Sequence, residues 1–156
     1  MKIKTQAALQ REITKLKRQG RKIVFTNGCF DLLHYGHAKY LQHAKDKGDI
    51  LVVAVNSDAS VRMIKGKKRP IVNEDNRLKL LSALESVDYL TLFKERTPMA
   101  VIKKVKPDIL IKGADWNKSN IAGRDFVESY GGKVITIKLV KGLSTTNLIK
   151  KIVNSR

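Results

Sequence analysis

Five short apolar segments recur along the chain, and each is separated from the next by a stretch with helical character. The apolar segments are residues 22–26, 49–58, 88–93, 108–113 and 133–140. Continuous apolar strands are typical of a parallel sheet that is covered on both faces, because alternation of polar and apolar residues is not needed there. The pattern therefore predicts an α/β fold, a Rossmann-like doubly wound sheet of five parallel strands with helices on both faces.

The intervening segments carry helix start and stop signals. Asn73 is suited to N-cap one helix, Pro98 fits the first turn of another, and Ser144 or a neighbouring threonine fits the start of the last. The predicted helices cover 5–19, 37–48, 74–87, 98–105, part of 120–132, and the stretch from about 143 onward. The first of them precedes the strand-helix-strand pattern, so its apolar face can cover its own sheet or pack against a neighbouring subunit.

Composition limits the class of protein further. A chain of 156 residues fits one domain, which can bury roughly 70% of its unfolded surface. No apolar run approaches the ~20 residues that span a bilayer, and no signal peptide is evident, so we expect a cytoplasmic protein without a membrane partner. The single cysteine, Cys29, excludes an internal disulfide; it could act as a nucleophile, although a lone cysteine beside a glycine is more typical of a small packing residue.

The charge is strongly positive. Lys and Arg number 32 against 14 Asp and Glu, which gives a formal net charge of +18. Such a balance favours anionic substrates, an anionic surface or nucleic acid as partners. No helix-turn-helix spacing, arginine-rich tail or aromatic RNA-binding signature accompanies the charge, so we do not expect nucleic acid to be the partner.

The segment NGCFDLLHYGH, residues 27–37, follows the first predicted strand. Free N–H groups at the start of a helix favour an anion such as phosphate, and His34 and His37 would flank that position. Gly28 would allow close backbone approach to a ligand, and Gly36 would allow a tight turn between the histidines. A zinc site is the competing interpretation, but the spacing lacks further histidine, cysteine or acidic ligands, so we expect no protein-bound metal.

The segment GCFDLLHYGH resembles the HxGH signature of a nucleotidyltransferase superfamily that includes the cytidylyltransferases. The segment GLSTTNLIKKI, residues 142–152, resembles the serine/threonine motif with which these enzymes hold nucleotide phosphates. The resemblance implies one nucleotidyltransferase domain over residues 1–156, with an N-terminal helix in 1–20 and a catalytic core in 21–152.

The middle of the chain narrows the resemblance. Residues 49–93 and 97–116 resemble the adenylyltransferases that act on D-glycero-β-D-manno-heptose 1-phosphate, in a stand-alone form without the sugar kinase to which that domain is often fused. The implied reaction transfers AMP from ATP to the heptose phosphate and releases pyrophosphate. Glycerol-3-phosphate cytidylyltransferases, which use CTP, are the alternative; the sequence LVKG before the serine/threonine motif lacks the arginine that those enzymes carry there.

The resemblance also implies roles for individual residues. The implied catalytic residues are His34, His37 and Lys45, and the implied substrate-binding residues are Asp31 and Lys112. The nucleotide would contact Thr26, Asn27, Gly28, Cys29, Phe30, His34, His37, Arg77, Gly113, Asp115, Ser144, Thr145 and Thr146. Mg²⁺ is expected with ATP, held by phosphate oxygens and water. The family commonly forms dimers or larger assemblies, so a homo-oligomer, most simply a dimer, is implied.

Overall fold

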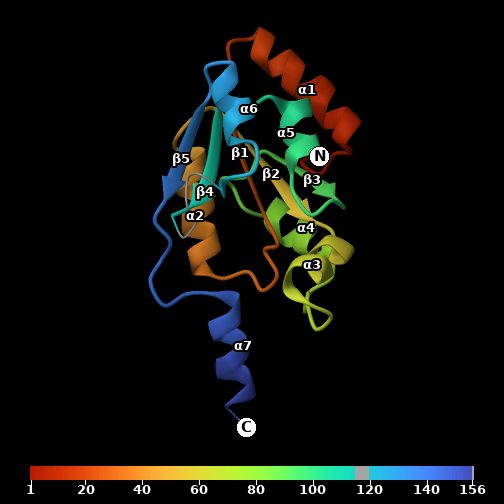
Figure 1. The fold of residues 1–156 in the computed structure, drawn as a ribbon, viewed down its shortest axis with the longest axis vertical. Coiled ribbons are helices and arrows are strands. Elements are labelled where there is room, and N and C mark those ends of the chain that lie inside the picture. Colours follow the sequence, from red (N-terminus) through yellow and green to blue (C-terminus); the bar gives the residue numbers. More distant parts are fainter. Residues whose placement is uncertain (115–119, 156) are drawn as a thin grey trace.

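The computed structural model describes residues 1–114 and 120–155. Its centre is a sheet of five parallel strands in the order β3-β2-β1-β4-β5, which confirms the predicted fold class (Figure 1). The strands are β1 (Ile23–Gly28), β2 (Ile50–Asn56), β3 (Tyr89–Phe93), β4 (Ile109–Gly113) and β5 (Lys133–Ile137). The strand order reverses between β1 and β4, and the carboxyl ends of strands at such a reversal are where ligands of open α/β sheets bind.

Seven helices connect and flank these strands within the described residues. They are α1 (Gln6–Arg18), α2 (Tyr35–Lys45), α3 (Asp58–Lys65), α4 (Glu74–Ser82), α5 (Met99–Val105), α6 (Arg124–Ser129) and α7 (Thr145–Val153). The predicted caps are confirmed, because the Asn73 side chain accepts a hydrogen bond from the backbone of Asn76 and the Ser144 side chain accepts one from the backbone of Asn147. The sequence pattern missed α3, because the segment predicted as the second strand ran through Asp58 and included the Ser57 N-cap of that helix.

Helices cover both faces of the sheet. One apolar cluster packs α2 and α4 against one face, and a second packs α1, α5 and α6 against the other. Leu9 and Ile13 of α1 are each only 1% exposed, and α1 lies alongside α5 (Figure 1). The apolar face of α1 therefore covers its own subunit, which decides between the two possibilities that the sequence left open.

The amino ends of the strands are closed by carboxylates. Asp49 accepts a hydrogen bond from the backbone N–H of Lys22, Asp108 from that of Ile23, and Asp88 from that of Leu51, at 2.6 to 2.7 Å. Each aspartate precedes one strand and binds the beginning of a neighbouring strand. The backbone groups at this edge are thus paired with protein acceptors, as buried polar groups require.

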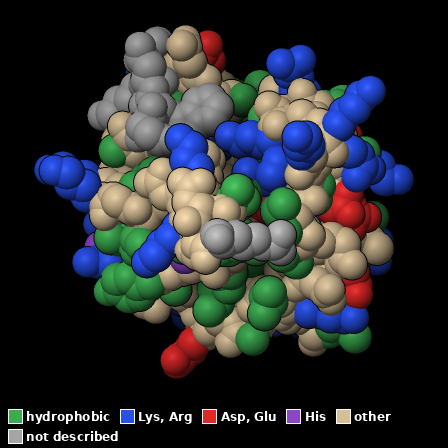
Figure 2. Space-filling model, turned by 90° about the horizontal axis from the view of Figure 1, so that it is seen from below, with side chains coloured by type: hydrophobic (Ala, Val, Ile, Leu, Met, Phe, Trp, Pro, Cys, Tyr) green, Lys and Arg blue, Asp and Glu red, His purple; other side chains and the backbone are tan. Residues whose placement is uncertain are grey.

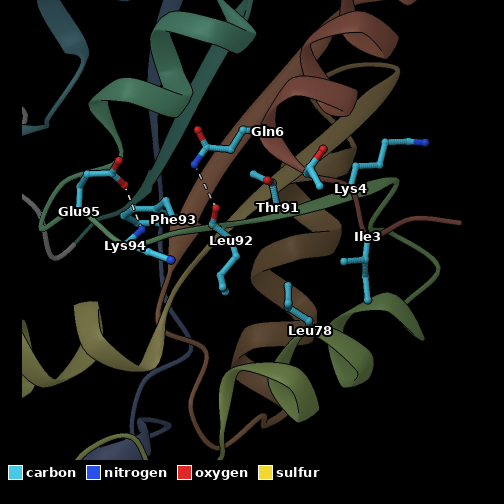
Figure 3. Close-up of a pocket in the computed structure, with 10 residues that line it drawn as sticks. Ile3, Lys4, Gln6, Leu78, Thr91, Leu92, Phe93, Lys94 and Glu95 are labelled. Carbon is cyan, nitrogen blue, oxygen red and sulfur yellow. Dashed lines mark hydrogen bonds between the residues drawn. The ribbon is translucent and has the colours of Figure 1, made fainter.

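The outer edge of β3 is partly covered by the start of the chain. Ile3 forms a parallel bridge with Leu90, and backbone hydrogen bonds run from Lys4 to Leu90 and from Leu90 to Lys2. Beyond this pairing lies a groove of about 490 Å³ along β3 (Figure 3). It is lined by Ile3, Lys4, Thr5, Gln6, Leu78, Thr91, Leu92, Phe93, Lys94 and Glu95, none of which is a predicted site residue.

The last helix stands apart from the layered body. α7 extends beyond the carboxyl edge of the sheet, and none of its residues is buried (Figure 1). Across residues 1–114 and 120–155, no helix is both long and apolar enough to cross a membrane.

Candidate active site

The two histidines of the HxGH segment lie together at the beginning of α2. His34 occupies the N-cap position with an extended backbone, and its side chain does not cap the helix. His37 lies in the first turn, and the two imidazole rings stack with their centroids 3.9 Å apart and their planes 22° from parallel. The prediction that both rings flank one spot at the carboxyl end of β1 is consistent with this geometry.

These imidazoles have unmet hydrogen-bonding capacity. Both ring nitrogens of His34 and the Nδ1 atom of His37 are buried without a hydrogen-bond partner among the described residues. Buried polar atoms in folded proteins are nearly always paired, so an unpaired group calls for a water or ligand partner. The pair of histidines is therefore the strongest candidate for direct ligand contact in the described chain.

Burial also fixes the charge state of the pair. Burial, with a smaller contribution from the neighbouring His34, lowers the pKa of His37 to about 4, and burial lowers the pKa of His34 as well. Both rings are consequently neutral near pH 7 when the site holds no anion. A neutral imidazole still has one N–H group, which can donate a hydrogen bond to a phosphate oxygen.

Gly36 plays a different part from the one predicted. It does not form a turn between the histidines, because α2 already begins at Tyr35 and Gly36 lies within its first turn. A Cβ atom on Gly36 would stand 3.0 Å from Nδ1 of His34 and 3.4 Å from Cβ of Leu143. Glycine thus lets the His34 ring and the segment that leads into α7 pack closely against this turn.

The contact with Leu143 brings the two sequence motifs together. Ser144 follows Leu143 directly and caps α7, and Thr145 and Thr146 form the first turn of that helix. The serine/threonine motif, more than 100 residues from the histidines in sequence, therefore begins beside them. Its free N–H groups and hydroxyls are the kind of groups that bind phosphate, a role that stays a prediction for these three residues.

Asp31 was predicted to bind the sugar substrate, but its carboxylate is already engaged by the protein. Its oxygens accept hydrogen bonds from the backbone of Ile71 and Val72 and from Nε of Arg69, at 2.5 to 2.9 Å, and the residue is 1% exposed. Burial alone would raise the pKa of Asp31, but these donors outweigh it and lower the pKa below the ordinary value. Asp31 therefore fixes the segment between α3 and α4 against the HxGH segment rather than facing a sugar.

Arg77 is similarly committed to protein partners. Its guanidinium donates to the backbone carbonyls of Cys29 and Val72 and to the carboxylate of Asp58, and the residue is 1% exposed. Direct phosphate binding by Arg77 stays a prediction, and the contacts observed here assign it a supporting role between α3, α4 and the end of β1. The sequence did not single out Asp58, Arg69 or Val72, because only the fold brings them against the motif.

Lys45 is the clearest correction. It ends α2, and its ammonium group donates to the carboxylate of Asp88 at 2.6 Å and to the backbone carbonyl of Asp49. Both aspartates precede strands at the amino edge, and eight residues of helix place Lys45 about 12 Å from His37 along the axis. Lys45 thus lies at the wrong end of the sheet for catalysis, because a helix that begins at the carboxyl edge of the sheet ends at the amino edge.

One pair of polar residues lies near the carboxyl ends of β1 and β4. Lys112 donates a hydrogen bond to the side chain of Asn27, which places both predicted residues at the strand-order reversal. Thr26, in contrast, is fully buried, and its hydroxyl contacts Tyr40 and donates to the carbonyl of Ile111. The Thr26 side chain is therefore committed to protein partners, and a nucleotide contact by this residue stays a prediction.

The remaining predicted residues take ordinary positions around the site. Gly28 ends β1 and Gly113 ends β4, whereas Asp115 lies outside the described residues. Burial raises the pKa of the Cys29 thiol, which disfavours the thiolate and favours the packing interpretation over the nucleophile. The described residues contain no group of three His, Cys, Asp or Glu side chains placed to hold a metal ion.

Positive charge lies on one side of the carboxyl edge. Arg62, Lys65, Lys67 and Lys68 are exposed on α3 and the segment that follows it. Seen from below, Lys and Arg side chains gather on one side of the face (Figure 2). An anionic ligand would thus approach the buried imidazoles past a cationic rim.

Comparisons with known proteins agree with this geometry. The chain is 52% identical over 151 residues to "Bifunctional protein HldE" from Trichlorobacter lovleyi, and the match covers 97% of this chain and 31% of the relative. It is also 52% identical over 154 residues to the protein of the same name from Geobacter metallireducens, and that match covers 99% of this chain and 31% of the relative. The chain thus spans about a third of the length of these curated relatives.

Solved structures with the same fold include a lipopolysaccharide core biosynthesis protein from Thermoplasma volcanium, at 36% identity and a TM-score of 0.65, covering 78% of this chain and 98% of that one. A pantoate-beta-alanine ligase from Francisella tularensis, at 16% identity and a TM-score of 0.65, covers 99% of this chain and 79% of that one and shares the fold alone. The cytidylyltransferase-like family profile matches residues 25–153. With the stacked histidines and the serine/threonine helix in the places that the motifs predict, the chain belongs to the cytidylyltransferase-like family of nucleotidyltransferases.

Proposed function

We propose that this protein transfers AMP from ATP to D-glycero-β-D-manno-heptose 1-phosphate, giving ADP-heptose and pyrophosphate. The observation that carries the proposal is the pair of imidazoles with buried, unpaired nitrogens at the start of α2, next to the beginning of α7. Similarity to the HldE proteins and to a lipopolysaccharide core biosynthesis protein supports the heptose phosphate as acceptor. We place the reaction in the cytoplasm, where ATP is available.

The reaction needs positioning more than acid-base chemistry. A phosphate oxygen of the sugar phosphate attacks the α-phosphorus of ATP, a new P–O bond forms, and the bond to pyrophosphate breaks with its electrons leaving on the pyrophosphate oxygen. Because the nucleophile is already an anion, no residue has to remove a proton from it. Catalysis then consists of alignment and of stabilising the negative charge that develops on the phosphoryl oxygens.

Each part of the site would contact a different part of the substrates. His34 and His37 would donate hydrogen bonds to oxygens of the α-phosphate and the leaving group, and the first turn of α7, with Ser144 and Thr145, would hold the distal phosphates. In the absence of ligand the imidazoles are neutral, so no charge is held away from water. A bound phosphate would favour their protonated form and so raise their pKa values. Asn27 and Lys112, which are hydrogen-bonded to each other near the strand-order reversal, would contact substrate there.

Magnesium fits this arrangement as the partner of the triphosphate. Since the described residues offer no cluster of protein ligands for it, phosphate oxygens and water would hold most of its coordination shell. The ion would neutralise charge on the triphosphate when bound with it.

Pyrophosphate release tests the proposal directly. The purified protein is incubated with Mg²⁺ and either ATP or CTP, each paired with D-glycero-β-D-manno-heptose 1-phosphate or glycerol 3-phosphate, and the His37→Ala variant serves as the control for contaminating enzymes. Release with ATP and the heptose phosphate alone supports the proposal. Release with CTP and glycerol 3-phosphate would replace it with the cytidylyltransferase activity that the family description also fits.

A further inference from the structure

The backbone of Phe30 is bent in an unusual way two residues after the end of β1. Its φ angle is +46°, in the left-handed region that bulky side chains rarely adopt. The side chain is nevertheless 6% exposed and belongs to the apolar cluster beneath α2 and α4. A conformation of this cost persists only where the surroundings enforce it, and such residues concentrate at functional sites.

The bend directs the phenyl ring toward the site. A Cβ atom on Gly28 would stand 2.9 Å from Cε2 of Phe30, so the ring lies directly over that glycine. The same ring meets His37 in an edge-on contact, with the centroids 5.3 Å apart and the planes at 66°. His37 is thus in contact with two rings, Phe30 and the stacked His34.

The bend itself is fixed from the other side by Arg77. Nη1 of Arg77 donates a hydrogen bond to the carbonyl of Cys29, which belongs to the peptide plane that φ of Phe30 rotates. Nε of the same side chain donates to the carbonyl of Val72, and Nη2 to the carboxylate of Asp58. A guanidinium anchored to three acceptors therefore prevents this peptide plane from turning back.

We propose that Phe30 and Arg77 are positioning residues for His37: Arg77 locks the left-handed bend at Phe30, and the bend holds the phenyl ring against the imidazole. The imidazole is thereby kept in one orientation before any substrate binds. Only the effect on turnover rests on the function proposed above, because the geometry concerns the protein alone.

The test combines NMR titration of His37 with steady-state kinetics on two variants. Phe30→Leu removes the ring but retains apolar volume, and Arg77→Lys retains the charge but cannot reach three acceptors at once. Phe126→Leu is the matched control, because Phe126 makes an edge-on ring contact with Tyr130 on α6, also at 5.3 Å. Thermal unfolding is followed for all three.

In Phe30→Leu and Arg77→Lys we expect the pKa of His37 to rise from about 4 by roughly one unit or more, because a less tightly enclosed ring is better solvated. Turnover should fall by about tenfold to a hundredfold, the effect of a slightly misplaced catalytic group, while KM for ATP changes less than about threefold. Phe126→Leu should change neither the pKa of His37 nor turnover. In the double variant with His37→Asn, the loss from Phe30→Leu should disappear, because both changes then act on one group.

An unchanged His37 titration in both variants, with only the unfolding temperature lowered as in Phe126→Leu, would overturn the proposal. Full additivity of Phe30→Leu and His37→Asn would overturn it as well. Since the titration needs no substrate, a protein that releases no pyrophosphate in any pairing would contradict the proposed function and leave this test intact.

Discussion

The amino and carboxyl ends of the sheet differ in how their polar groups are paired. At the amino end, Asp49, Asp88 and Asp108 each accept a backbone hydrogen bond, and the nearby cation of Lys45 is paired with Asp88. At the carboxyl end, His34 and His37 keep buried nitrogens unpaired. The contrast teaches that the paired polar residues of the amino end complete the fold, and that the unpaired buried nitrogens of the carboxyl end mark where a ligand is to be sought.

The largest effect should come from the unpaired end. Replacing either His34 or His37 by alanine should lower turnover by ~100-fold or more, because one lost donor to a developing oxyanion costs about 3 kcal/mol. Pyrophosphate release measured at saturating substrates checks this, with circular dichroism as the control for folding. Turnover within threefold of wild type in either variant would remove that histidine from the proposed mechanism.

The supporting network at the same end should combine loss of activity with loss of stability. Asp31→Asn weakens the hydrogen bonds to Arg69, Ile71 and Val72, and hydrogen bonds to a charged group contribute about 1.5 to 3 kcal/mol. We expect the free energy of unfolding to fall by about 2 kcal/mol, measured by urea denaturation, with a smaller loss of turnover than for the histidines. A variant of unchanged stability and lost sugar-phosphate binding would restore Asp31 to the substrate site.

The free energy of unfolding should depend on pH through the ring of His37. The folded-state pKa of His37, about 4, lies below its unfolded value of 6.5, so its contribution is fully present above pH 6.5 and is lost as pH falls toward 4. The wild-type free energy of unfolding should therefore decline across this window, by at most about 3 kcal/mol and by less where the ring is solvated. His37→Asn should flatten the decline; an identical slope in both proteins would show that His37 is not buried as a neutral ring.

The smallest effect should be at the paired end. Lys45→Gln removes a partly exposed ion pair with Asp88, in which each side chain is 27% exposed, so the free energy of unfolding should fall by no more than about 1 kcal/mol. Turnover should stay within twofold of wild type, since Lys45 lies at the far edge from the histidines. A tenfold loss of turnover would contradict the separation of the two ends and support the role that the resemblance gave to this lysine.

Much of the fold could be predicted because its signals are local. The five apolar runs, the Asn73 and Ser144 caps and Pro98 each act on a few neighbouring residues, and the strands and helices follow from them. The helix α3 was missed where a strand signal and a cap signal shared the segment 49–58. For the same reason the pairing of His34 with His37 could be predicted, since three residues separate them.

The rest of the site depended on contacts that spacing does not encode. Asp31 is paired with Val72, Arg77 with Asp58, and Thr26 with Ile111. Each partner comes from another element of the fold, and the partner decides whether the polar group is available to a ligand. The predicted catalytic role of Lys45 does not fit the direction of α2, because a helix that begins at one edge of a sheet ends at the other.

The first residues of the chain affect behaviour in concentrated solution. An uncovered strand edge presents unpaired N–H and C=O groups that can template pairing with another molecule. By lying along Leu90 of β3, the segment Lys2–Lys4 occupies part of that edge with the chain's own backbone and adds two lysines beside it. Loss of these few residues should therefore leave the histidines untouched and favour self-association, so that the N-terminal segment contributes to colloidal stability.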